Sequence, residues 1–316
     1  MALYDTPEDI AALATLDDEF AQILATMPPQ GALPEPKVMR QYSNAMEEQQ
    51  YSASATTKVR EHTIKITMRD GHENEAIVYQ SALRSSSQSP LVVLCYGGGF
   101  ILGTNKQYAA TARAAALLYG ATVVNISYRL APENPFPTPA NDVWDNIEWL
   151  ARNAHTFNAD LSAGFILGGG SAGANLAAVT MHKAIRTTLS PPLTGLYLAV
   201  PFLLMEDIVP DQYRSLWIAR KQNAKAPILN EDALNGRLPA ACEISRLLSF
   251  QRSGILLEAA SHICARVPHG FNGMFPRLKQ SKRFDIETAV GLGWLLRVKE
   301  DRERVEAFFI DMRGDA

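Results

Sequence analysis

Short, almost wholly apolar runs alternate with amphipathic stretches along most of this chain. Four runs rich in Val, Leu and Ile predict buried strands: 91–95, 121–127, 165–167 and 193–203. Apolar side chains recur at helical spacing in four other stretches: 111–119, 141–151, 174–186 and 288–298. Strands that alternate with helices predict an α/β fold, in which a mostly parallel central sheet carries helices on both faces.

The two ends of the chain follow other patterns. A helix is expected to begin at Thr6-Pro7, with one apolar face made of Ile10, Leu13, Leu16, Phe20, Ile23 and Leu24. A second, more polar helix is expected over 37–50. The runs 59–68 and 74–80 predict a hairpin that turns at Asp70-Gly71. The charged tail 299–316 is expected to fray.

The glycine-rich stretch 164–177 carries the clearest chemical signal. Gly169-Gly170-Ser171-Ala172-Gly173 has the pattern G-x-S-x-G, between an apolar strand and a helix of small residues. So sharp a turn leaves no room for side chains two residues before and after the serine. The helix then directs its first N–H groups at the place where negative charge develops. Ser171 is therefore a candidate nucleophile. The alternative is a glycine-rich corner whose serine has no catalytic role.

Two further segments supply the partners that such a serine needs. The apolar run 91–95 leads into a glycine triplet, and the N–H groups of Gly98, Gly99 and Ala172 are candidates for an oxyanion hole. His269, between Pro268 and Gly270, follows the serine in the chain and is the candidate general base. A histidine in such a loop could instead cap a turn.

Taken together, these motifs resemble the hormone-sensitive-lipase-like group of α/β-hydrolases, most closely its fungal members. The resemblance covers nearly the whole chain and rests on Tyr96-Gly-Gly-Gly-Phe100, Ser127-Tyr-Arg-Leu-Ala-Pro-Glu133, Phe136-Pro137, 169–177 and Pro268-His-Gly-Phe271. It implies an α/β-hydrolase fold with a helical cap segment over 1–55 and a core over 56–203. It further implies a cap or pocket insertion over 204–236 and a remainder of the core, apparently shortened, over 237–316.

The resemblance also implies a catalytic aspartate after the penultimate strand, and this chain departs from it there. Aligning 240–245 with that strand puts Leu248 at the acid position, and leucine cannot orient an imidazole. Glu243 is a weak replacement, because it lies short of the carboxyl end of the strand. Two stretches also look short against the family pattern, one before Gly236 and one between Glu258 and Pro268, and residues 236–267 would fit an error in the gene model.

Two milder departures lie beside the catalytic motifs. Tyr96 stands where the family has a histidine before the glycine triplet, and its hydroxyl is a candidate anchor for that loop. Gly170 stands where the family has an aspartate before the serine, which removes a carboxylate that braces neighbouring loops.

Composition narrows the class of protein. The 316 residues have a net charge of -3 and are 47% hydrophobic, which suits one large α/β domain or two small ones and favours neither nucleic acid nor an anionic membrane as partner. The three cysteines, Cys95, Cys242 and Cys264, favour thiols over a disulfide framework. No spacing predicts a metal site and no motif a cofactor. Without an apolar run of about 20 residues or a secretory signal, no membrane span and a cytoplasmic location are expected. Nothing indicates the oligomeric state.

The sequence thus favours a serine-type hydrolase of carboxylic esters or lactones, which acts on a small-molecule ester, lactone or polyketide-like substrate. Its activity is expected to be weak, because the acid position is Leu248. One alternative is a non-hydrolytic enzyme, such as a cyclase, of a fungal secondary-metabolite pathway. Another is a ligand-binding pseudo-hydrolase like the plant gibberellin receptors, which keep the serine and have lost the histidine; the presence of His269 argues against it.

Overall fold

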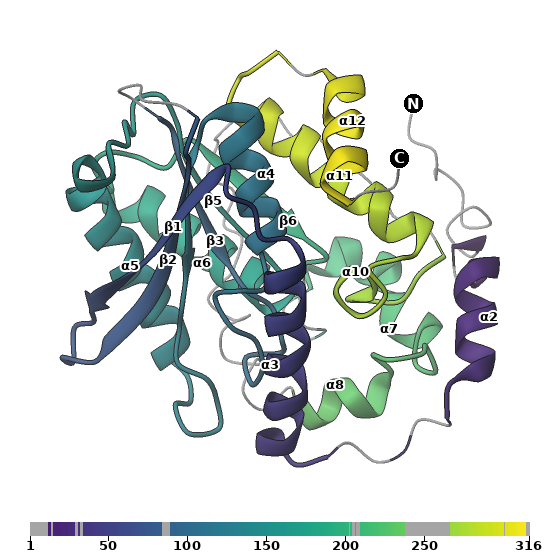
Figure 1. Cartoon of the computed structure of the whole chain (residues 1–316). Coiled ribbons are helices and arrows are strands. Elements are labelled where there is room, and N and C mark those ends of the chain that lie inside the picture. Colours follow the sequence, from purple (N-terminus) through teal and green to yellow (C-terminus); the bar gives the residue numbers. More distant parts are fainter. Residues whose placement is uncertain are drawn as a thin grey trace.

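The central element of the described part of the chain is a six-stranded sheet (Figure 1). The computed structural model describes residues 12–13, 15–28, 31, 34–83, 89–201, 203, 206, 209–237, 266–299 and 301–313. The strand order in the sheet is β1-β2-β4-β3-β5-β6. The predicted hairpin is present as β1 (Val59–Thr67) and β2 (Glu73–Ser81), and β2 also runs antiparallel to β4 (Thr122–Ile126). The strands β4, β3 (Leu91–Cys95), β5 (Phe165–Gly170) and β6 (Gly195–Ala199) are mutually parallel.

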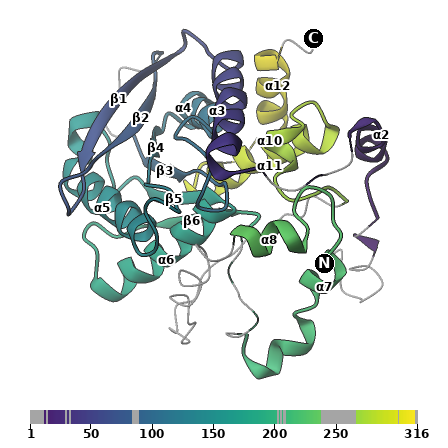
Figure 2. The ribbon, with the colours of Figure 1, turned by 90° about the horizontal axis from the view of Figure 1, so that it is seen from below.

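Helices cover both faces of this sheet, as the alternation of strands and helices predicts (Figure 2). One face carries α5 (Thr138–Asn153) and α6 (Ala172–Thr187); the opposite face carries α4 (Ala109–Tyr119), α11 (Lys279–Leu295) and α12 (Arg302–Arg313). Successive side chains of a strand point to opposite faces. Strand β3 therefore gives Leu91, Val93 and Cys95 to one apolar cluster, and Val92 and Leu94 to the other.

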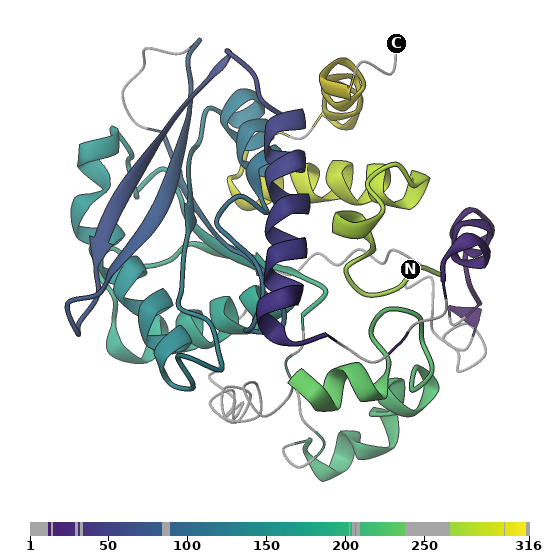
Figure 3. The same ribbon diagram turned by 60° about the horizontal axis from the view of Figure 1, so that its bottom comes forward.

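The N-terminal helices lie outside this three-layer core. Helix α3 (Pro36–Ala53) stands between the sheet and the side of the molecule that carries α2 (Asp18–Thr26) and α10 (Phe271–Met274), as Figure 3 shows. Its C-terminal end is fixed by the fully buried Arg113 of α4, which donates to the carbonyl of Tyr51 and pairs with Glu61 of β1. Helices α2 and α3 belong to the predicted segment 1–55, whose role as a cap stays a prediction.

Short helices connect the rest of the described chain. They are η1 (Ala154–Phe157), η3 (Asp211–Leu216), α7 (Ala219–Gln222) and α8 (Glu231–Arg237). The last three fall within the predicted insertion 204–236 and its C-terminal edge. The strand expected over 240–245 lies outside the described residues.

Two expectations about the ends of the chain are corrected. The described part of the first helix does not continue from Leu13 but begins at Asp18, because Asp17 accepts the N–H groups of Glu19 and Phe20 and so caps a new helix there. The charged tail does not fray over 302–313. It forms α12, which buries Val305 and Phe309 against the sheet-covering helices.

Candidate active site

Ser171 lies at the junction of β5 and α6, in the position expected of a nucleophile elbow. Its backbone has φ 52° and ψ −115°, a left-handed conformation that a residue with a side chain rarely adopts. The N–H of Ser171 donates to the carbonyl of Ala199 on β6 at 2.9 Å, which holds the turn in this conformation. Such strain persists only where surrounding contacts over-determine it, and it concentrates at functional sites.

The glycines on either side of Ser171 are required by close packing. A Cβ at Gly173 would lie 2.3 Å from the carbonyl oxygens of Cys95 and Tyr96, and one at Gly169 would lie 2.6 Å from the backbone of Gly173. Backbone atoms cannot move aside as the end of a side chain can. The predicted need for small residues two positions before and after the serine is therefore confirmed by the geometry.

Gly170, the third glycine of this motif, has a different neighbour. A Cβ there would meet the hydroxyl of Tyr108 at 2.0 Å. Burial raises the pKa of Tyr108 well above its ordinary value, so this hydroxyl stays protonated. Tyr108 thus fills the space that a larger residue at position 170 would need, which accounts for the glycine at that position.

The glycine triplet after β3 lies against the serine turn. A Cβ at Gly97 would lie 2.8 Å from the carbonyl of Gly170, so the two loops touch through their backbones. Positive φ values at Gly98 (123°), Gly99 (62°) and Phe100 (64°) fold the loop back on itself. The hydrogen bonds among the described residues leave the N–H groups of Gly98 and Gly99 without a protein acceptor. The N–H of Gly97, in contrast, donates to the side chain of Gln107 at 2.7 Å.

His269 reaches Ser171 from a separate loop. Its Nε2 lies 2.7 Å from the Ser171 Oγ, which is hydrogen-bond distance between residues 98 positions apart. The next residue but one, Phe271, begins α10 and is buried beside Phe20 and Leu278. An aromatic anchor two residues away thus fixes the loop that carries the histidine. The sequence predicted Ser171 and His269 to be near each other, and the structure brings them together.

The segment 127–133 braces the strand that leads to the glycine triplet, not the serine turn itself. The hydroxyl of Tyr96 donates to the carbonyl of Tyr128 at 2.6 Å, the hydroxyl of Tyr128 donates to the carbonyl of Tyr96 at 2.9 Å, and the two rings stack. The Tyr96 hydroxyl, a predicted candidate to anchor the glycine loop, therefore holds the strand end from which that loop departs.

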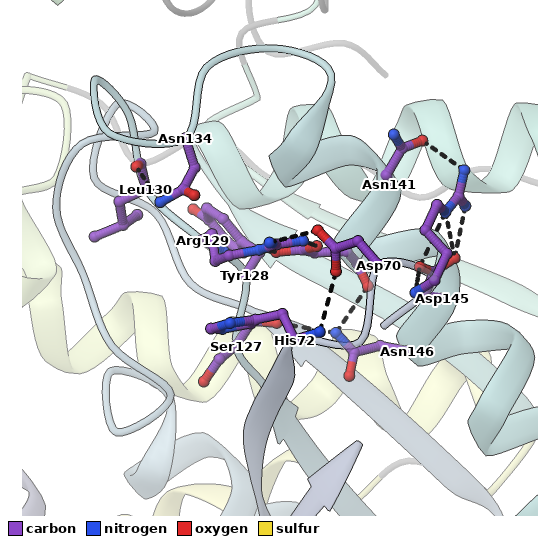
Figure 4. Close-up of polar contacts among 12 residues, drawn as sticks. Asp70, His72, Ser127, Tyr128, Arg129, Leu130, Asn134, Asn141, Asp145 and Asn146 are labelled. Carbon is purple, nitrogen blue, oxygen red and sulfur yellow. Dashed lines mark hydrogen bonds and ion pairs between the residues drawn. The ribbon is translucent and has the colours of Figure 1, made fainter. Parts of the chain in front are cut away.

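Arg129, the next residue of this segment, is fixed by two carboxylates (Figure 4). Its guanidinium donates to Asp142 of α5 and to Asp70 of the hairpin turn, each at 2.7 Å. The hydrogen bond from Arg129 holds the pKa of Asp70 below its usual value. Arg129 thereby joins the segment 127–133 to the β1–β2 turn and to helix α5.

Ser171, His269 and the three glycines line a cavity of about 1960 Å³. Much of its wall is apolar and comes from α3, from α8 and from the segment before α7, with Met39, Met46, Leu102, Trp217 and Leu234 among the lining residues. Ligand pockets usually occupy about 300–1,000 Å³, so this cavity is large for a small ester. The described part of the predicted insertion 204–236 therefore contributes to the walls beside the candidate catalytic residues.

The candidate positions for the triad acid, Leu248 and Glu243, lie outside the described residues. No cluster of three or more His, Cys, Asp or Glu side chains that could hold a metal occurs among the described residues. Within the same residues, none of the helices has the length and apolar character needed to cross a bilayer. Cys95 is a buried free thiol, as predicted, and Cys242 and Cys264 lie outside the described part.

Sequence reasoning missed three residues beside the site: Glu47, Gln107 and Tyr108. Each lies on a polar or mixed stretch with no motif. Gln107 contacts Gly97, Tyr108 contacts Gly170, and Glu47 acts through Gln107. The one available signal was Gly170 itself, because an unexpected glycine indicates that another group occupies the space.

A mostly parallel sheet with a serine at the turn after β5 and a histidine at hydrogen-bond distance is the arrangement of the α/β-hydrolase fold. Residues 92–242 match the family model described as alpha/beta hydrolase fold. Carboxylesterase NlhH of Mycobacterium tuberculosis is 36% identical over 149 residues, 47% of this chain and 44% of that protein. An AB hydrolase superfamily protein of Schizosaccharomyces pombe is 30% identical over 166 residues, 52% of this chain and 49% of that protein. The chain is thus similar to carboxylesterases and other α/β-hydrolases over about half of its length.

Solved structures share the fold over nearly the whole chain. Vibralactone cyclase superposes with a TM-score of 0.79 at 23% identity and covers 90% of this chain and 96% of its own. A hyperthermophilic esterase of the archaeon Pyrobaculum calidifontis gives 0.69 at 23% identity, with 95% and 99% covered. At this identity the likeness shows the fold alone. The chain spans about half the length of the curated relatives it matches.

Proposed function

We propose that this protein is a serine-type hydrolase of carboxylic esters or lactones. Ser171 is the nucleophile, His269 the general base, and the N–H groups of Gly98, Gly99 and Ala172 form the oxyanion hole. The observation that carries the proposal is the 2.7 Å contact between Ser171 Oγ and His269 Nε2, on a turn that also touches the glycine loop.

The geometry suits each step of acyl transfer. His269 Nε2 takes the proton from Ser171 as Oγ attacks the carbonyl carbon, and the oxyanion that forms accepts hydrogen bonds from N–H groups. The protonated His269 then gives its proton to the leaving alcohol. Water, activated by the same histidine, releases the acid from Ser171. The N–H of Ala172 is suited to this role because the first N–H groups of a helix have no partner within it.

The experiment combines labelling with turnover. A fluorophosphonate is expected to label the wild-type protein at Ser171, and p-nitrophenyl acetate and butyrate to be hydrolysed weakly, as expected with Leu248 at the acid position. Ser171→Ala should abolish labelling, and both Ser171→Ala and His269→Ala should lower the remaining kcat by about 10²-fold, because the losses of triad members are not additive. Labelling of a residue other than Ser171 would refute the assignment. Turnover at ordinary esterase rates would refute the impairment and make Glu243 the first carboxylate to test.

The size and apolar wall of the cavity favour a second candidate, a cyclisation that uses the same acyl-enzyme. In that reaction an internal hydroxyl of the substrate, not water, attacks the Ser171 ester, and a lactone leaves. A cavity of about 1960 Å³ has room for the folded substrate that this needs. Mass spectrometry separates the two: the cyclised product has one water less than the hydrolysed acid.

A further inference from the structure

Hydrogen bonds from helix α3 hold both ends of the glycine loop, residues 97–101. At the start of the loop, the N–H of Gly97 donates to Gln107 Oε1 at 2.7 Å, and Gln107 Nε2 donates to Glu47 Oε1 on α3 at 3.2 Å. At the end of the loop, Arg40 Nε of the same helix donates to the carbonyl of Ile101 at 2.7 Å. The backbone between these two attachments contains the three left-handed residues 98–100.

The loop needs such support because its conformation is unfavourable. Phe100 has a side chain and yet adopts φ 64°, a strained conformation that persists only where the surrounding structure fixes it. A Cβ at Gly98 would lie 2.4 Å from the carbonyl of Leu102, so the loop folds tightly onto itself. The direction of the Gly98 and Gly99 N–H groups depends on this fold.

Glu47 holds the side chain of Gln107 in place. It is buried, and its second carboxylate oxygen accepts the hydroxyl of Thr104, which lies just after the loop. The carboxylate thus receives donors from Gln107 and Thr104, one on each side. The Ser43 hydroxyl of the same helix is a third side-chain donor, at 3.4 Å from Oε1, and the three hydrogen bonds offset the cost of burying the carboxylate.

We propose that Glu47 and Gln107 are positioning residues for the oxyanion hole, through the hydrogen-bond relay from α3 by way of Gln107 to the N–H of Gly97. Gln107 uses its oxygen to turn the Gly97 N–H away from the site, which leaves the next two N–H groups to face the substrate. Glu47 fixes which end of the Gln107 amide faces Gly97. This role rests on the proposed hydrolase function; the hold on the loop itself does not.

Exchanging the two side chains gives the sharpest test. Gln107→Glu keeps an acceptor for Gly97 but places a second carboxylate against Glu47, so the relay breaks. In the double variant Glu47→Gln/Gln107→Glu, the new amide at 47 donates to the new carboxylate at 107, which again accepts the Gly97 N–H. Glu47→Gln alone keeps an acceptor for Gln107, and its amide can donate to the Thr104 hydroxyl.

Two readouts keep this proposal separate from the proposed function. The first is hydrogen exchange of the peptide 96–103, which needs no activity: exchange should be at least about tenfold faster in Gln107→Glu and return to the wild-type rate in the double variant. The second is hydrolysis of p-nitrophenyl butyrate: kcat should fall at least about tenfold in Gln107→Glu, with KM changed less than about threefold, because an oxyanion hole acts on the transition state.

The controls fix the interpretation. Glu47→Leu should show the same changes in both readouts as Gln107→Glu. Glu47→Gln, which keeps an acceptor for Gln107, should match wild type. Gln49→Leu changes an exposed position of the same helix and should also match wild type in both readouts. Wild-type exchange in Gln107→Glu, or a double variant no better than the single one, would overturn the relay. A wild-type protein that neither hydrolyses the ester nor reacts with fluorophosphonate would refute the proposed function, while exchange would still test the hold on the loop.

Discussion

At the scale of single residues, the candidate site is shaped by side chains that fill or avoid specific positions. Ser171 is held in a left-handed conformation by its N–H bond to Ala199, and Gly169 and Gly173 allow backbones to touch around it. Tyr108 completes this arrangement by placing its hydroxyl where a side chain at position 170 would begin. The strain at the serine is therefore balanced by contacts that tolerate little change in volume.

The contact between Gly170 and Tyr108 gives a prediction about stability. Gly170→Ala adds a methyl group 2.0 Å from the Tyr108 hydroxyl and should lower the free energy of unfolding by about 1–3 kcal/mol, the usual cost of overpacking. Tyr108→Phe removes the hydroxyl and leaves Cζ at 3.3 Å as the nearest atom. The double variant should regain most of the loss in urea unfolding. Additive losses would show that the two residues do not share this space.

Glu47 gives a prediction about pH. Burial raises its pKa above the value of 4.5 expected in the unfolded chain, against the opposing effect of its hydrogen bonds. A native state that binds the proton more tightly loses stability as the pH rises through the window above 4.5. Glu47→Gln removes this loss, so it should gain stability relative to wild type between about pH 4 and about pH 7. Urea unfolding at both pH values measures the gain. A difference that does not change with pH would refute the raised pKa.

At the scale of elements, what the sequence predicted depended on how many residues shared one pattern. The central strands were found because each contains a run of apolar residues, and every residue of β3, β4 and β5 is buried. Ser171 was found because its motif lies on a strand–turn–helix, and His269 was found because it follows that serine in the chain between a proline and a glycine. Helix α12 was missed because half of its residues are charged, and among its described side chains only those of Val305 and Phe309 are buried. The Glu47 relay could not be predicted, since it joins single polar residues 60 positions apart.

The buried face of α12 should therefore matter more than its charge suggests. Phe309 is 3% exposed in the cluster that covers one face of the sheet, and Phe309→Ala should lower the free energy of unfolding by about 3 kcal/mol. Its neighbour Ile310 is 51% exposed, and Ile310→Ala should change stability by no more than about 0.5 kcal/mol. Equal effects of the two variants in thermal and urea unfolding would mean that α12 is not docked as described.

At the scale of the whole molecule, the N-terminal segment touches both sides of the candidate site. Helix α3 holds the glycine loop through Arg40 and Glu47. Helix α2 packs on the histidine side, where Phe20 meets the ring of Phe275 edge-on at a centroid distance of 5.3 Å. The segment before α2 is bound there as well, because Asp17 donates its N–H to the carbonyl of Arg266. The proposed oxyanion hole and the proposed general base thus depend on one stretch of about 40 residues that lies outside the sheet.

This arrangement predicts that Phe20, although far from Ser171 in the sequence, controls the position of His269. Phe20 is fully buried beside Phe271, which begins α10 two residues after the histidine. Phe20→Ala leaves a cavity under that loop and should lower the free energy of unfolding by about 3 kcal/mol. A shift of the imidazole by about 1 Å would also lower kcat by up to about 10²-fold.

Phe20→Leu is the matched control, because it keeps most of the apolar volume under the loop. It should lose about 1 kcal/mol and keep kcat within about threefold of wild type. Both variants are compared well below their unfolding temperatures, with the folded fraction measured by circular dichroism and the rate of fluorophosphonate labelling as a second activity readout. If Phe20→Ala loses stability but keeps the wild-type labelling rate in its folded fraction, α2 supports the fold without positioning His269. A parallel loss of labelling and kcat, absent from Phe20→Leu, would show that the N-terminal segment holds the general base in place.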